Sequence, residues 1–293
     1  MINDIFKVRS CSSCISAALN VYSSNFTKIF KATWFWTLIY SVLIGIFIIA
    51  IEHILSINAK ITVIGLAATT SILLAIITDA RIKGELVSML NEVPKKKLFI
   101  KTISANVLAV IFSLTICIMI VIVDYCSFKI AESFKFSQMT TTITTIITIL
   151  CVIILSIIFI APFIHSVTSY LFNTDSSMKS IFGMQYKKGF HKLGFILSVI
   201  ITTSLLSLVM YIFLCLPAYI TNIANNIDNY GVNNGDTSGI PSYFVWLNLF
   251  SSILMAFVMQ YVSLWTILVY IYTYGSVEAI TADNKTHTIE ITK

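Results

Sequence analysis

The run Ala32–Ile51 reads ATWFWTLIYSVLIGIFIIAI and decides the class of fold, because its 20 residues include no charged side chain. Two more such runs follow, with 18 residues between Lys60 and Asp79 and 22 between Lys101 and Asp124. The hydrocarbon core of a bilayer is about 30 Å thick, and a helix of roughly 20 apolar residues crosses it. Each run therefore predicts a membrane-spanning helix.

The composition of the chain favours the same class of fold. Of the 293 residues, 57% are hydrophobic and 11% are charged, whereas a soluble domain has roughly 45–50% apolar and about 25% charged residues. These proportions exclude a soluble enzyme, a nucleic-acid-binding module and a disordered chain. An outer-membrane barrel is excluded too, since its strands would alternate apolar and polar residues over about 10 positions.

Three longer charge-free runs complete the pattern, at Phe136–Thr174, Leu193–Ile227 and Thr237–Val277. A second helix within any of them would need turn residues near its middle. Pro162 and Pro217 lie near one end of their runs instead, so each run is counted as one span. The sequence thus predicts an all-α polytopic membrane protein with six transmembrane helices, at residues 33–52, 61–78, 103–123, 141–163, 194–217 and 244–273.

The distribution of Lys and Arg predicts the orientation of these spans. Sixteen of the nineteen lie in the N-terminal segment, the second and fourth connections and the C-terminal tail, and only Lys60, Lys129 and Lys135 lie on the other side. Loops rich in Lys and Arg stay in the cytoplasm. Both termini are therefore expected inside, with a cytoplasmic segment at 1–31, a transmembrane domain at 32–277 and a cytoplasmic tail at 278–293. The net charge of +6 reflects this bias, so no nucleic-acid partner is expected.

The segment 12–31 has an apolar stripe of its own. Its large apolar residues recur at spacings of three and four, which is typical of one face of a helix; they are Ile15, Leu19, Tyr22, Phe26, Ile29 and Phe30. We expect an amphipathic helix that lies in the inner membrane interface and leads into the first span. The alternative is a helix that faces the cytoplasm and packs on the loops.

The second connection, residues 79–101, is the candidate site for a partner protein. Ile82, Leu86, Met89 and Val93 follow one another at helical spacing, and Pro94 is expected to end the helix. The glycine of this segment would let another backbone approach closely, and the lysines at 95–97 suit anionic headgroups. The residues of this predicted partner-coupling loop are Arg81, Lys83, Gly84, Leu86, Met89 and Pro94.

Within the spans the polar residues of interest are few. No Asp, Glu, Lys or Arg falls inside any predicted span, which disfavours a transporter coupled to protons or ions. Asn106 and Gln260 are expected to bond across helices, at about 1 kcal/mol each, although Gln260 could instead line a pathway. His165, three residues after Pro162, is expected to pack at the membrane edge.

Sequence patterns for catalysis or cofactor binding are missing. The four histidines are far apart, and the chain has no HExxH motif, no GxSxG motif and no Walker A sequence. We therefore predict neither enzymatic activity nor a cofactor nor a resident metal. The pair Cys11 and Cys14 has the CxxC spacing of redox and zinc sites, but no further Cys or His lies in the first 50 residues. Two interpretations remain. The cysteines are small residues at the start of a helix, or they have a redox or intersubunit metal role.

Three motifs give the chain a resemblance to a known family. FIAPFI at 159–164 is followed by KKGFHK at 187–192, a fifth span and LCLPAY at 214–219. In this order the chain, over roughly residues 15–275, resembles the six-span family that includes the membrane domain attached to some bacterial glycerophosphodiester phosphodiesterases. The resemblance implies a multi-pass protein of the cytoplasmic membrane of a bacterium, without the catalytic residues of the attached enzyme.

A second, local resemblance concerns DARIKGELVSMLNEVP at 79–94. It is similar to the stretch after the second span in permeases of the ABC-2 type, where a helix and a proline touch the ATPase. That resemblance implies a transport or export subunit that a separate cytoplasmic ATPase energises. The alternative is a non-catalytic membrane scaffold or envelope accessory protein. Expected partners are membrane lipids and either such an ATPase or further copies of the chain.

Overall fold

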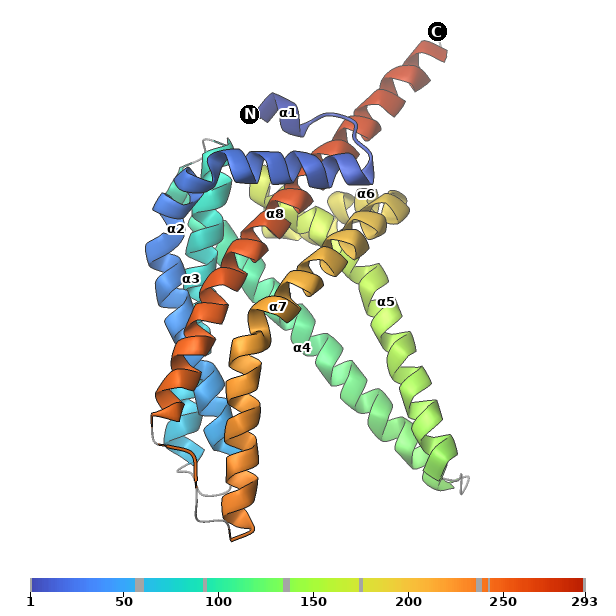
Figure 1. Cartoon of the computed structure of the whole chain (residues 1–293). Helices are drawn as coiled ribbons and strands as arrows, with labels where there is room; N and C mark the ends of the chain where they lie inside the picture. Colours follow the sequence, from blue (N-terminus) through green and yellow to red (C-terminus); the bar gives the residue numbers. More distant parts are fainter. Residues whose placement is uncertain are drawn as a thin grey trace.

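The computed structural model describes residues 2–55, 61–91, 94–133, 138–173, 176–235, 239–241 and 243–291 (Figure 1). This part of the chain is helical and has no strand. Its elements are α1 (Ile2–Ile5), α2 (Cys11–Leu55), α3 (Ile61–Asn91), α4 (Lys95–Ser133), α5 (Gln138–Phe172), η1 (Met178–Phe182), α6 (Met184–His191), α7 (Leu193–Asn233) and α8 (Phe244–Ile291).

Six of these helices, α2, α3, α4, α5, α7 and α8, are long and apolar enough to cross a membrane. The predicted all-α fold with six transmembrane helices is thereby confirmed, and the chain is a multi-pass membrane protein. Each of the six helices extends beyond the span predicted within it. The helix expected within the second connection, residues 79–101, is the continuation of α3, and α7 continues past 217, where the fifth span was expected to end, to Asn233. Pro217 lies inside α7, where neighbouring elements can satisfy the freed backbone groups.

The first part of α2 lies across the end of the bundle that carries both termini, and the helix then bends into the first span (Figure 1). This is the arrangement expected of the N-terminal amphipathic helix, while its place in the lipid interface stays a prediction. The apolar stripe is divided. Ile29 is buried and the Tyr22 hydroxyl donates to the Tyr261 carbonyl oxygen at 2.9 Å, whereas Leu19 and Phe26 are exposed. The helix thus packs on α8, where the exposed Phe26 also lies against the Tyr261 ring, while Leu19 faces outward.

Helix α8 forms the centre of the bundle. It packs against α2 and α7, and its residues Leu264, Leu268 and Tyr272 are fully buried together with Ile82 and Leu86 of α3. Helices α4 and α5 contact each other, and with increasing distance from the termini they diverge from the other long helices (Figure 1). The molecule therefore has a packed bundle and a projecting hairpin.

The N-terminal segment folds back onto the end of α8. The Arg9 backbone N–H donates to the Ser276 Oγ at 2.9 Å, and this hydroxyl donates to the Arg9 carbonyl oxygen at 3.2 Å. A side chain at Gly275 would overlap the backbone of Ile5, which is fully buried. Outside the spans, a hydrogen bond from Lys7 and the nearby Arg9 lower the pKa of Asp4.

Candidate intramembrane polar site

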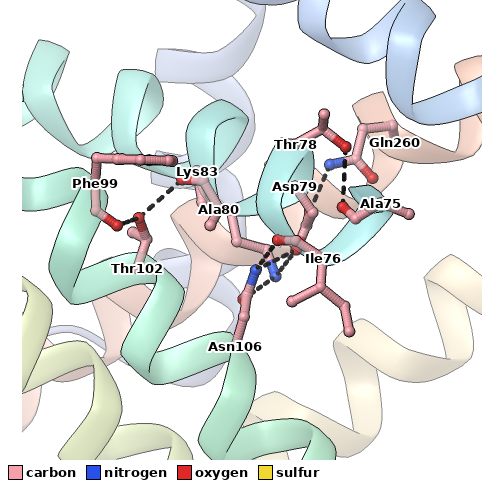
Figure 2. A network of polar contacts seen from close by, with 10 residues as sticks. All are labelled: Ala75, Ile76, Thr78, Asp79, Ala80, Lys83, Phe99, Thr102, Asn106 and Gln260. Carbon is pink, nitrogen blue, oxygen red and sulfur yellow. Dashed lines mark hydrogen bonds and ion pairs between the residues drawn. The ribbon is translucent and has the colours of Figure 1, made fainter. Parts of the chain in front are cut away.

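The carboxylate of Asp79 lies at the meeting point of three helices (Figure 2). Its Oδ1 accepts a hydrogen bond from Gln260 Nε2 of α8 at 2.8 Å. Its Oδ2 accepts one from Asn106 Nδ2 of α4 at 2.9 Å and forms an ion pair with Lys83 Nζ at 2.5 Å. We call these four residues, Asp79, Lys83, Asn106 and Gln260, the Asp79 network.

The network is closed on itself. Asp79 and Lys83 are four residues apart on α3, a spacing that puts them on one face of a helix. Lys83 Nζ also donates to Asn106 Oδ1 at 3.0 Å, and Asn106 Nδ2 donates to the Ile76 carbonyl oxygen at 3.2 Å. Both charged groups thus meet complementary groups, which offsets the cost of removing an ion pair from water.

The position of the network along the helices places it within the membrane-spanning bundle. Asp79 is 18 residues after Ile61, the first residue of α3, which corresponds to about 27 Å at 1.5 Å per residue. Gln260 is 16 residues after Phe244, the first residue of α8, or about 24 Å. The network thus lies well inside both helices rather than at either end of α3 or α8. The second predicted span ends at residue 78, but the helix that contains it continues through Asp79 and Lys83 to Asn91.

Two cavities border on the network. The polar cavity has a volume of about 320 Å³ and lies between α2, α3, α7 and α8; it is lined by Tyr40, Ile44, Asp79, Lys83, Tyr211, Met255, Ala256, Met259, Gln260 and Ser263. The apolar cavity, of about 250 Å³, lies between α3, α4, α5 and α8; it is lined by Lys83, Asn106, Thr102, Thr168, Tyr270 and ten aliphatic or phenylalanine side chains. Lys83 lines both cavities, so the ion pair stands at the boundary between them.

A second buried cation fixes α4 against the end of α5. Lys101 Nζ donates to the carbonyl oxygens of Tyr170 at 3.0 Å and Asn173 at 2.5 Å, and to Ser176 Oγ at 3.2 Å. The last carbonyl groups of a helix have no partner within it and attract a cation. Asn91 of α3 adds a hydrogen bond to the Phe172 carbonyl oxygen at 2.7 Å. These contacts hold the start of the hairpin rigidly beside the apolar cavity.

Part of the predicted partner-coupling loop is buried within the chain itself. Leu86 is 1% exposed, and a Cβ at Gly84 would lie 3.7 Å from the backbone of Phe99, so the backbone that approaches this glycine is that of α4. Arg81 pairs with Glu85 at 3.2 Å and lies over the rings of Trp36 and Phe99. Lys83 belongs to the Asp79 network.

The exposed part of this loop is its tip. Met89 is 37% exposed, and Pro94 and Lys95 are exposed as well. Only this tip presents a surface to a partner, whereas the face formed by Ile82 and Leu86 packs inside the bundle. The partner-coupling role of the loop stays a prediction.

The predicted intramembrane polar contacts divide into two groups. Asn106 and Gln260 come together around Asp79, so the interhelical role expected of them is present, and Gln260 also lines the polar cavity. His165 lies apart from the network. It is 3% exposed, its ring meets that of Tyr274 at 5.3 Å edge to face, and neither ring nitrogen has a hydrogen-bond partner within the described residues.

The cysteine pair lies in the first turn of α2. Both thiols are free, and Cys14 is buried with its Sγ 3.9 Å from the Tyr272 carbonyl oxygen. Cys11 Sγ lies 3.9 Å from Thr202 Oγ1. Within the described part of the chain, no group of three or more His, Cys, Asp or Glu side chains is placed to hold a metal ion.

Sequence reasoning missed Asp79 as a site residue, although a signal was present. An acid and a base four residues apart, directly after an apolar run, can pair along the helix and let the span continue. The partner Gln260 is 181 positions away, so only the folded chain brings it to Asp79.

No protein family model, no curated protein and no solved structure matches the chain.

Proposed function

We propose that the chain is the membrane-embedded subunit of a transport or export system in the cytoplasmic membrane of a bacterium, energised by a separate ATPase. The observation that carries this proposal is the Asp79 network at the boundary of two cavities. Ionisable residues at depth in a membrane domain commonly line substrate pathways. Ligand sites are typically pockets of about 300–1,000 Å³, and the polar cavity, at about 320 Å³, is at the lower end of this range.

The energy source is assigned to another protein because the chain has no Walker A sequence. Helix α3 offers a mechanical link to it. Asp79 and Met89 lie on this one uninterrupted helix, ten residues apart, which is about 15 Å. A force on the tip of the loop would therefore be transmitted to the ion pair. The resemblance of residues 79–94 to ABC-2 permeases supports the same assignment, and the proposal gives the chain no catalysis of its own.

The test is affinity purification of the tagged chain in a mild detergent, followed by mass spectrometry. We expect an ATPase in near-stoichiometric amount. Met89→Asp should lower its recovery at least fivefold at equal abundance of the tagged chain, because a carboxylate replaces the apolar tip. Met139→Asp is the matched control, since Met139 is also exposed but lies on α5, at the end away from the termini. Absence of any ATPase from the wild-type preparation would remove the transport proposal.

A second candidate, the non-catalytic scaffold, is favoured by one observation. Both carboxylate oxygens of Asp79 already accept hydrogen bonds or an ion pair from within the chain. A network of this kind can serve to hold α3, α4 and α8 in register. Under that hypothesis the tip variant and its control behave alike, and no ATPase is recovered.

A further inference from the structure

We propose that the polar cavity binds the headgroup of a membrane amphiphile, and that this headgroup has no net charge. The inference rests on the proposed function, because it names the class of substrate that the transport system would move. It depends on three properties of the cavity: how its lining is divided, which hydrogen-bonding groups are unused, and how its charges balance.

The lining has a polar and an apolar part. Asp79, Lys83 and Gln260 bring a carboxylate, an ammonium and an amide, and further side chains bring hydroxyl groups; they are Tyr40, Tyr211 and Ser263. The remaining lining residues are Ile44, Met255, Ala256 and Met259. A purely polar solute would leave the apolar residues without a complementary surface. A hydrocarbon would leave the polar residues without one. A molecule that has both kinds of surface is an amphiphile.

Several polar groups of the lining have hydrogen-bonding capacity left. Of the three donors of the Lys83 ammonium, two are used by Asp79 and Asn106. Gln260 uses its Nε2 for Asp79, and its carbonyl oxygen accepts no hydrogen bond from the described residues. The hydroxyls of Tyr40 and Tyr211 likewise make no hydrogen bond within the described part of the chain. The cavity thus offers both donors and acceptors to a ligand.

The charges of the cavity disfavour a ligand that carries a net charge of either sign. Among the described residues of its lining the charged ones are Asp79 and Lys83, and these already neutralise each other. A charged headgroup would add a third charge without a counterion, which is costly where water is scarce. An uncharged headgroup with hydroxyls, or a zwitterionic one, adds no net charge and can still use the free donors and acceptors.

The volume sets the size of the bound group. At about 30 Å³ per water-sized group, 320 Å³ holds roughly ten such groups. This corresponds to a headgroup and the first part of its chain rather than a whole phospholipid. The rest of the chain would extend along the bundle surface.

The experiment is isothermal titration of the purified chain, held in amphipol, with four amphiphiles that share an eight-carbon tail, each below its critical micelle concentration. The probes are octyl glucoside, octylphosphocholine, octyl sulfate and octyltrimethylammonium. We expect saturable binding, near one per chain, of at least one of the two probes without net charge, at least tenfold tighter than of either charged probe. Equal or tighter binding of a charged probe, or no saturable binding of any, would overturn the proposal.

Matched variants locate the site. Tyr211→Phe removes one hydroxyl from the cavity and should weaken binding about fivefold, in line with the loss of one hydrogen bond. Tyr219→Phe removes the same atom from the same helix at a position that is 63% exposed and outside the cavity, and should change nothing. Ser263→Leu should fill the cavity and abolish binding; if that variant fails to fold, the two tyrosine variants decide. Equal affinities of these two would overturn the assignment to this cavity.

The outcome is separable from that of the proposed function. Binding is measured on the chain alone, whereas the transport proposal depends on a co-purifying ATPase. Selective binding without an ATPase keeps the site and removes the transport system. An ATPase without selective binding keeps the transport system and removes the site.

Discussion

The α4–α5 hairpin is more apolar than α8, but less of it is buried inside the chain. In α5, none of the described residues in the most apolar 18-residue stretch is buried inside the chain, whereas in α8 half of that stretch is buried. Yet α8 has Asn248, Gln260 and a series of buried serine and threonine residues. In a bilayer the most apolar helix has least need of protein contacts, because lipid is as apolar as a protein core. The polar residues are the ones that need partners.

The largest effect is expected from the ion pair of the bundle. Asp79→Leu leaves Lys83, whose side chain is 26% exposed, without its counterion, which costs about 3 kcal/mol, the lower end of the range for a buried pair. We expect a strong loss of monodisperse protein in size-exclusion chromatography and a lower thermal unfolding midpoint. Asp124→Leu, at an exposed position of the hairpin, should have little effect. Restoring much of the stability by the double variant Asp79→Leu with Lys83→Leu would confirm that the unpaired charge, rather than the lost packing, is responsible.

A matched pair of leucines tests the difference in packing directly. Leu268 of α8 is fully buried, whereas Leu155 of α5 is 55% exposed. Leu268→Ala should lower the free energy of unfolding by about 2–4 kcal/mol, since it leaves a cavity. Leu155→Ala should lower it by less than about 1 kcal/mol, because lipid can fill the space. Equal losses in denaturant titrations would show that the hairpin is packed against something in the membrane, such as a second copy of the chain.

The smallest effect concerns the N-terminal segment on α8. Gly275→Ala places a methyl group against the backbone of Ile5, and overpacking of this kind costs about 1–3 kcal/mol. We expect the segment to detach while the bundle stays folded, so that trypsin cleaves faster after Lys7 and Arg9. Gly194→Ala, where no atom lies within 4 Å of the added Cβ, should leave the cleavage rate unchanged. Unchanged cleavage in Gly275→Ala would mean that the segment shifts without detaching.

Much of the fold could be predicted from the sequence. The charge-free runs predict six spans, and the structure has six helices able to cross a membrane. The helices extend beyond these predicted spans, because the rule that a charged residue after an apolar run ends a helix does not hold here. Asp79 shows why this fails: Lys83, four residues further on, pairs with it and lets α3 continue to Asn91.

The candidate site could be predicted only in part. Asn106 and Gln260 stand out as polar residues within apolar runs, and both belong to the Asp79 network. The apolar stripe of the loop does not by itself show what it contacts. Leu86 has the same helical spacing from Ile82 whether this face binds a partner or packs in the cluster with α8. The close approach at Gly84 was predicted as well, but the backbone that comes near is that of α4.

The sequence by itself determined the class of the protein and the number of its spans. The physical reason is that a bilayer of fixed thickness imposes one length and one composition on every helix that crosses it. The tertiary structure alone decided which faces are interior and which residues meet around Asp79. Lipid and protein interior are similarly apolar, so the apolar pattern cannot separate them, and Gln260 reaches Asp79 only because α3 and α8 both pack against α2.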